Sequence, residues 1–117
     1  MKKLLCCLLL VISAPVFAQQ NTVTWDYQAS DVTKYGLTHF SLERKAVACG
    51  TTTVNFAEVA QIPPELRTFA DTAVTPGVTY CYRMSAVNPT AVSAYSNEAG
   101  RTVPFAVPVA PSGLTVQ

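Results

Sequence analysis

Charged side chains, histidine and glycine are all scarce in this 117-residue chain. Asp, Glu, Lys and Arg together make up 13% of the residues, and the formal net charge is +1 at pH 7. So small a charge argues against a nucleic-acid partner, because nucleic acids are bound through clustered basic residues. The five glycines are isolated from one another, so no glycine-rich loop is available to bind a phosphate group.

Residue sets for catalysis or metal binding are also lacking. The single histidine, His39, is followed by Ser41 and Glu43, residue types that occur in catalytic triads. Alternate positions on one strand cannot place a nucleophile, a base and an orienting group together without a pocket. One histidine and scattered carboxylates provide no metal site. We therefore expect a protein that is not an enzyme and holds neither metal nor cofactor, with His39 exposed to solvent.

The only long apolar run lies at the N-terminus. Lys2 and Lys3 precede an apolar stretch over residues 4–12, and Val16 and Ala18 occupy the small-residue positions of a cleavage site. This pattern is typical of a secretory signal peptide, so we predict that residues 1–18 are one and that the mature protein is secreted, periplasmic or part of the cell envelope. The run is shorter than the roughly 20 residues of a membrane span, so no stable span is expected after cleavage. Retention of the segment as an anchor is the alternative.

Removal of this segment changes the charge and the cysteine content. Lys2 and Lys3 leave with it, so six of the eight basic residues remain against seven acidic ones. Of the four cysteines, Cys49 and Cys81 remain. Two cysteines in an exported protein are typically joined in a disulfide, with two free thiols as the alternative.

The remainder of the chain alternates apolar and polar residues in short segments. Residues 80–87 show this best, with an aromatic or apolar side chain at every second position, which is typical of a half-buried strand. Further strands are expected over residues 22–27, 39–47, 54–59, 67–71 and 94–103. The connection 29–38 is rich in turn residues, and no segment after residue 18 has convincing helical periodicity. Short strands at intervals of about ten residues predict a single all-β domain, a two-sheet sandwich.

The positions of particular residues resemble those of a fibronectin type III domain. The match spans residues 22–103 and consists of Trp25, Phe40 and Leu42, Val74 six residues before Tyr80, the run Tyr80, Tyr82, Met84, Ala86 and Asn88, and the sequence Tyr95-Ser96-Asn97. The resemblance implies an immunoglobulin-like sandwich over residues 19–103, with a core of Trp25, Phe40, Leu42, Val74, Tyr80, Tyr82 and Met84. It also implies that Tyr80 is a tyrosine corner, whose hydroxyl bonds to the backbone near the Pro76-Gly77 turn.

The same resemblance implies that the two cysteines of the mature chain lie close together. Cys49 follows the strand that contains Phe40, and Cys81 lies near the start of the strand that contains Tyr80. In the family these two strands are antiparallel neighbours, so the end of one lies beside the start of the other. Alternation directs Tyr80 inward and Cys81 to the outer face. We therefore predict a disulfide between Cys49 and Cys81 on that outer face.

The two ends of the mature chain depart from the family pattern. A complete domain has a further strand before the one that carries the tryptophan, but only residues 19–24 lie between the predicted cleavage site and Trp25. Residues 104–117 form a proline-rich apolar tail, and residues 110–117 resemble the opening strand of such a domain. We expect a domain that lacks its first strand and carries an additional one at its end.

These features favour a non-catalytic exported module for binding or adhesion, whose protein or glycan ligand the sequence does not identify. The candidate binding loop contains Asn88, Pro89, Thr90 and Val92, since loops at the ends of sandwiches often carry recognition. The alternative is a structural subunit that self-associates, in which residues 110–117 complete the sandwich of the same copy or of a neighbouring copy. A truncated multi-domain protein is a third interpretation.

Overall fold

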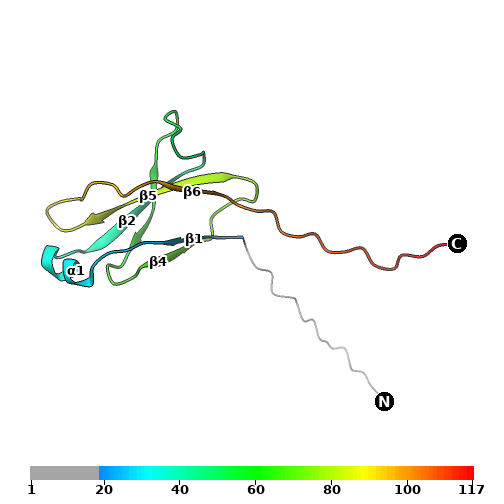
Figure 1. Cartoon of the computed structure of the whole chain (residues 1–117), viewed down its shortest axis with the longest axis horizontal. Helices are drawn as coiled ribbons and strands as arrows, with labels where there is room; N and C mark the ends of the chain where they lie inside the picture. Colours follow the sequence, from blue (N-terminus) through cyan, green and yellow to red (C-terminus); the bar gives the residue numbers. More distant parts are fainter. Residues whose placement is uncertain (1–18) are drawn as a thin grey trace, which may run out of the picture.

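The computed structural model describes residues 19–117, and the predicted signal peptide lies outside the described residues. The elements are β1 (Asn21–Thr24), α1 (Ala29–Tyr35), β2 (His39–Lys45), β3 (Ala57–Ile62), β4 (Thr68–Asp71), β5 (Thr79–Val87) and β6 (Ala99–Thr102). The strands form two antiparallel sheets, one with the order β1-β4 and one with the order β3-β2-β5-β6 (Figure 1). Two such sheets with one short helix are compatible with an all-β sandwich.

The inner face of the larger sheet follows from the alternation along β2 and β5. Phe40 and Leu42 on β2 lie opposite Ala86 and Met84 on β5, so apolar side chains from neighbouring strands share one face. Tyr80 and Tyr82 continue this face and are buried. Two further core residues, Ile62 on β3 and Val103 after β6, are fully buried, although the sequence reasoning did not single them out.

The smaller sheet covers this face with aromatic side chains. Trp25 and Tyr27 follow β1, and their rings meet the ring of Phe40 edge-on at centroid distances of 5.6 and 5.1 Å. Edge-to-face packing of this kind is a favourable arrangement for aromatic pairs. Trp25 and Val74 are partly buried and pack against the core.

The region 29–38 contains a helix, so the expectation of a turn-rich connection without helix was wrong. Helix α1 spans seven residues and ends at Gly36, whose positive φ of 62° is readily adopted by glycine. No residue of the helix is buried. A helix that buries no face does not need the apolar periodicity by which helices are recognised in a sequence.

The strands differ in extent from the sequence prediction, β3 and β6 most of all, and β1 and β2 end at residues 24 and 45 rather than at 27 and 47. Strand β3 covers residues 57–62 rather than 54–59, and regular pairing near the C-terminus is confined to β6 rather than to 94–103. The segment 93–98 still lies along β5. The backbone N–H groups of Ser93 and Ser96 donate to carbonyls of β5, and the hydroxyls of the same two serines accept hydrogen bonds from backbone N–H groups of β5. Side-chain oxygens thus take the place of backbone carbonyls there, and the pattern of alternation does not reveal the substitution.

Candidate functional site

The outer face of the larger sheet carries the disulfide. Cys49 and Cys81 are bonded, with 5.1 Å between their Cα atoms. Cys81 is fully buried, and its partner on the neighbouring strand β6 is Gly100. A Cβ atom at Gly100 would lie 3.0 Å from the Cys49 sulfur, so a larger residue would crowd the bond. Glu98 lies near both sulfurs. Since the sulfurs are bonded to each other, they provide no thiolates for a metal ion.

Part of this outer face is covered by a stack of cations and aromatic rings. The Arg83 guanidinium lies between the rings of Phe56 and Tyr95, at 4.1 and 3.6 Å from their centroids, and forms an ion pair with Glu43. Lys45 also lies over the Phe56 ring, at 4.6 Å from its centroid. These contacts cover this part of the sheet.

The residue types of a catalytic triad on β2 do not come together. His39 Nδ1 lies 3.1 Å from the Thr38 hydroxyl, the Ser41 hydroxyl donates to Glu58, and Glu43 pairs with Arg83. Each of the three side chains on β2 therefore has a different partner, and no nucleophile–base pair is formed by them.

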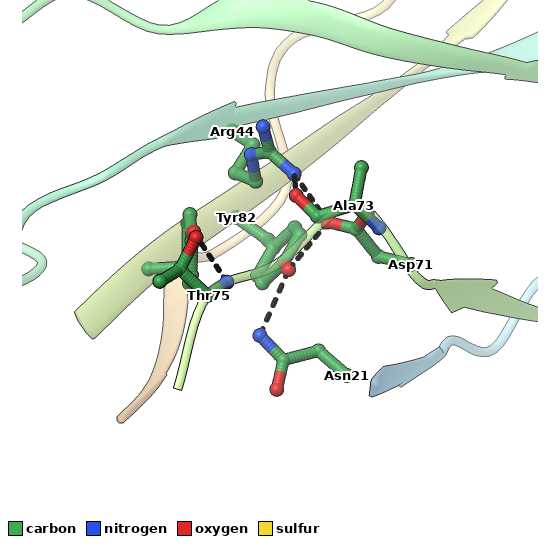
Figure 2. Close-up of polar contacts among 7 residues, drawn as sticks. Asn21, Arg44, Asp71, Ala73, Thr75 and Tyr82 are labelled. Carbon is green, nitrogen blue, oxygen red and sulfur yellow. Dashed lines mark hydrogen bonds and ion pairs between the residues drawn. The ribbon is translucent and has the colours of Figure 1, made fainter. Parts of the chain in front are cut away.

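A buried polar cluster joins the two sheets at the end of the sandwich where β1 begins (Figure 2). The Asn21 side chain donates to the Tyr82 hydroxyl at 2.9 Å, and this hydroxyl donates to Asp71 Oδ2 at 2.7 Å. Arg44 donates to the same Asp71 oxygen at 2.8 Å and to the Ala73 carbonyl at 3.0 Å. The four side chains come from β1, β2, β4 and β5, so the cluster fastens one sheet to the other.

The cluster changes the protonation of its members. Burial by itself would raise the pKa of Asp71, but the hydrogen bonds from Tyr82 and Arg44 outweigh it and lower the pKa below its ordinary value. Burial, together with the hydrogen bond to Asp71, raises the pKa of Tyr82 to about 12, although the bond from Asn21 opposes the change. Burial by itself would lower the pKa of Arg44, but the hydrogen bond to Asp71 and the charge of that carboxylate outweigh it and raise the pKa. The cluster is therefore a charged pair with a neutral phenol at ordinary pH.

Tyr80 is fixed beside this cluster. Its hydroxyl accepts a hydrogen bond of 3.0 Å from the backbone N–H of Thr75, just before the Pro76-Gly77 turn. The Arg44 guanidinium lies 4.9 Å from the centre of its ring. Tyr80 thus ties the turn that precedes β5 to the sheet.

An open groove of about 470 Å³ lies between the two sheets toward the other end of β1. We call this feature the inter-sheet groove. Val23, Trp25 and Tyr27 line one side of it, and Ala94, Tyr95 and Ala99 line the other. Leu42 and Met84 of the larger sheet contribute to its interior. The groove is therefore lined largely by apolar and aromatic side chains, as is usual for binding sites.

Trp25 in this groove has an unusual environment. Its indole Nε1 is buried and has no hydrogen-bond partner among residues 19–117. Buried donors of this kind are rare in folded proteins, because leaving one without an acceptor costs free energy. Trp25 is also the only tryptophan of the chain, so its fluorescence reports on the groove alone.

The strand beside the groove has a free edge. Strand β1 pairs with β4 only, and the Trp25 N–H continues that ladder by donating to the Arg67 carbonyl. Because hydrogen-bonded pairs alternate in an antiparallel ladder, the backbone groups of Thr22 and Thr24 point away from β4, and Thr24 lines the groove. Arg101 binds the Gln20 carbonyl at the start of this edge. A free strand edge next to an apolar groove is the geometry that accepts an additional strand.

The predicted binding loop is held by its own side chains. Asn88 Oδ1 accepts hydrogen bonds from the backbone of Thr90 and Ala91, and its Nδ2 donates to the Tyr35 carbonyl. Both ends of the amide are therefore engaged in holding the loop against α1. Pro89, Thr90 and Val92 are exposed, and Val92 lines a shallow hollow of about 250 Å³ with Tyr35.

The comparisons with known proteins identify no family. A scan of the chain against protein-family models finds no match, and a search of curated proteins finds no similar sequence. None of the helices formed by residues 19–117 is long and apolar enough to cross a lipid bilayer. The function therefore has to be argued from the geometry of the site.

Proposed function

We propose that this protein is a non-catalytic exported binding module of the fibronectin type III type, and that it binds an extended apolar segment in the inter-sheet groove. The order of the strands supports the fold. A two-stranded sheet, β1-β4, and a four-stranded sheet, β3-β2-β5-β6, correspond to the B-E and C′-C-F-G sheets of that family. Among residues 19–117, no strand lies beside β1 in the position where the family has its A strand.

A single observation carries the binding function: the free edge of β1 lies beside an apolar groove. An extended segment that pairs with β1 would satisfy the backbone groups of Thr22 and Thr24 by adding to the ladder. Its alternate side chains would point between the sheets, next to Val23 and Trp25. Main-chain hydrogen bonds then give affinity, and the apolar groove selects the side chains.

The disulfide supports the proposed location. Stable disulfides persist in oxidising compartments and are rare in the reducing cytosol. The bonded pair Cys49 and Cys81 fits a protein of the extracellular space or the cell envelope. Export requires a targeting segment, and the predicted signal peptide at residues 1–18 would supply it.

A synthetic strand peptide tests the proposal. The probe is a lysine-flanked peptide of alternating valine and threonine, and the control replaces the central threonine by proline, which cannot extend a ladder. We expect the probe, but not the control, to shift the emission of Trp25 and to slow amide hydrogen exchange in β1. An Ala94→Arg substitution places a long charged side chain in the groove and should abolish both responses.

The matched control for this substitution is Ala91→Arg. Ala91 lies in the same exposed connection but lines the shallow hollow rather than the inter-sheet groove. The control should leave the peptide response unchanged. If the peptide fails to bind the unsubstituted protein at dilutions where the chain is monomeric, or binds the Ala94→Arg variant equally well, the groove is not the binding site.

A further inference from the structure

The C-terminal tail, residues 104–117, is the most exposed apolar part of the described chain. Five of its side chains are between 75% and 94% exposed: Phe105, Val107, Val109, Leu114 and Val116. No residue of the tail belongs to a strand or helix, and none has a charged side chain. So much exposed apolar surface on one segment indicates a contact that the isolated chain does not make.

The tail and the inter-sheet groove have complementary features. The residues Leu114–Gln117 lack proline and place Leu114 and Val116 on one face of an extended strand, with Thr115 and Gln117 on the other. This four-residue segment matches the length of β1, whose free edge lies beside an apolar groove. One chain therefore contains both a free strand edge beside a groove and an apolar segment that could pair with it.

The exit of the tail directs it away from the groove of its own chain. Val103 is fixed by backbone hydrogen bonds with Gly77 and Val78. The Phe105 ring then lies directly against Gly77, so close that a Cβ atom there would be 2.5 Å from it. The tail consequently leaves at the end of the sandwich where β1 begins and extends into solvent (Figure 1).

A return of the tail to its own groove would require a sharp reversal. The reversal would have to occur within residues 104–113, where Pro104, Pro108 and Pro111 restrict the backbone. The returning segment would also run parallel to β1, whereas the groove of a second molecule can receive the tail in the antiparallel direction. Antiparallel pairing is somewhat more stable per residue.

We propose that residues 110–117 of one copy occupy the inter-sheet groove of a second copy, pairing with the free edge of its β1. The inference rests on the function proposed above and names the partner for that site. Leu114 and Val116 enter the groove beside Val23 and Trp25. Residues 104–109 act as a semi-rigid spacer of about 19 Å. Because donor and acceptor are different surfaces, the contact repeats head to tail and builds rings or filaments.

The first test measures molar mass by size-exclusion chromatography with light scattering, using the exported full chain over a range of concentrations. We expect mass and Trp25 emission to change together as concentration rises. Leu114→Lys with Val116→Lys should weaken association by roughly 100-fold or more, because charged groups would enter an apolar groove. The matched control, Thr115→Lys with Gln117→Lys, alters the opposite face of the same segment and should weaken association far less.

A mixing experiment tests the head-to-tail arrangement. The Leu114→Lys/Val116→Lys variant has an intact groove, and the Ala94→Arg variant has an intact tail. Each should be monomeric alone, whereas the mixture should form a complex with one copy of each. A symmetric interface, in which both copies use the same surface, would not be restored by mixing.

Other outcomes separate this inference from the function on which it rests. If the chain stays monomeric but the lysine tail variant shifts the Trp25 emission, the tail fills its own groove, and assembly between copies is refuted. A third outcome is a monomeric chain in which the lysine substitutions leave the Trp25 emission unchanged and the valine–threonine peptide still binds. In that case the groove is a strand acceptor for another partner. If no peptide binds and no association occurs, both proposals fail. Association that survives the lysine substitutions would also overturn the inference.

Discussion

The surroundings of β1 differ between its two ends. At its start, where Asn21 lies, buried polar side chains from both sheets bind one another and close the sandwich. Toward Trp25 and Tyr27 an open groove lies between the sheets, the adjoining segment 93–99 is exposed, and a buried indole N–H has no acceptor among residues 19–117. The closed end has its polar groups satisfied, whereas the open end has an unsatisfied donor and a free edge. The difference indicates that the closed end maintains the fold and the open end is suited to binding.

The largest expected effect comes from the disulfide, which lies at the closed end beside Tyr80 and Tyr82. It joins residues 32 positions apart, and a closed loop of that length restricts the unfolded chain by roughly 3–4 kcal/mol. Cys49→Ala with Cys81→Ala should lower the free energy of unfolding by about that amount, measured by urea denaturation. A loss below about 1 kcal/mol would mean that the closed end does not depend on the bond.

The next largest effect is expected from Asp71→Ala. The substitution leaves Arg44 and the Tyr82 hydroxyl without their shared acceptor in a buried site. Removing one partner of such a cluster should cost about 2–3 kcal/mol of unfolding free energy. Glu98→Ala changes an exposed carboxylate and serves as the control, with an expected change within about 0.5 kcal/mol. Equal effects of the two substitutions would remove the distinction that we draw for the closed end.

The contribution of Asp71 should depend on pH. Its pKa is lowered in the folded protein, so the folded state holds the proton less tightly than the unfolded state. The stabilisation is therefore fully present above the ordinary pKa of 3.8 and is lost as pH falls through the folded value. Urea titrations at a series of pH values should show the difference between the wild type and Asp71→Asn shrinking in that acid range. A difference that stays constant down to the lowest pH would contradict the lowered pKa.

Tyr82 should give a smaller contribution to stability, and this contribution should be lost at high pH rather than at low pH. Its pKa is raised from 10.0 to about 12, so folding favours the neutral phenol. The stabilisation is fully present below pH 10 and is lost as pH rises toward the folded value. Tyr82→Phe should cost about 1 kcal/mol near neutral pH and should flatten the alkaline decline in stability. Tyr35→Phe, at an exposed position, is the control and should leave that decline unchanged.

The smallest effect on stability is expected at the open end. Ala94→Arg alters an exposed residue that lines the inter-sheet groove, so the free energy of unfolding should change by no more than about 0.5 kcal/mol. The same substitution should abolish the response of Trp25 to the strand peptide. If the variant loses peptide binding but keeps its stability, the open end serves binding and the closed end serves stability. A large loss of stability would mean that the groove walls are part of the core.

Sequence reasoning worked best where burial imposes a pattern. Phe40 and Leu42, Tyr80 and Met84 stand at alternate positions because one face of each strand is buried, and these four side chains are buried in the structure. It failed at α1, which buries no face, and at segment 93–98, where Ser93 and Ser96 replace regular pairing by hydroxyl bonds. The assignment of Asn88 to recognition stays a prediction, and in the structure the Asn88 amide holds its own loop.

The sequence by itself determined the strand alternation, the pairing of the only two cysteines after residue 18, and the existence of an uncharged apolar tail. Each of these depends on residue types or on neighbours a few positions apart. The tertiary structure alone decided that Asn21, Arg44, Asp71 and Tyr82 form one cluster and that the free edge of β1 borders a groove. Both features depend on how two sheets approach each other, which alternation along a single strand does not specify.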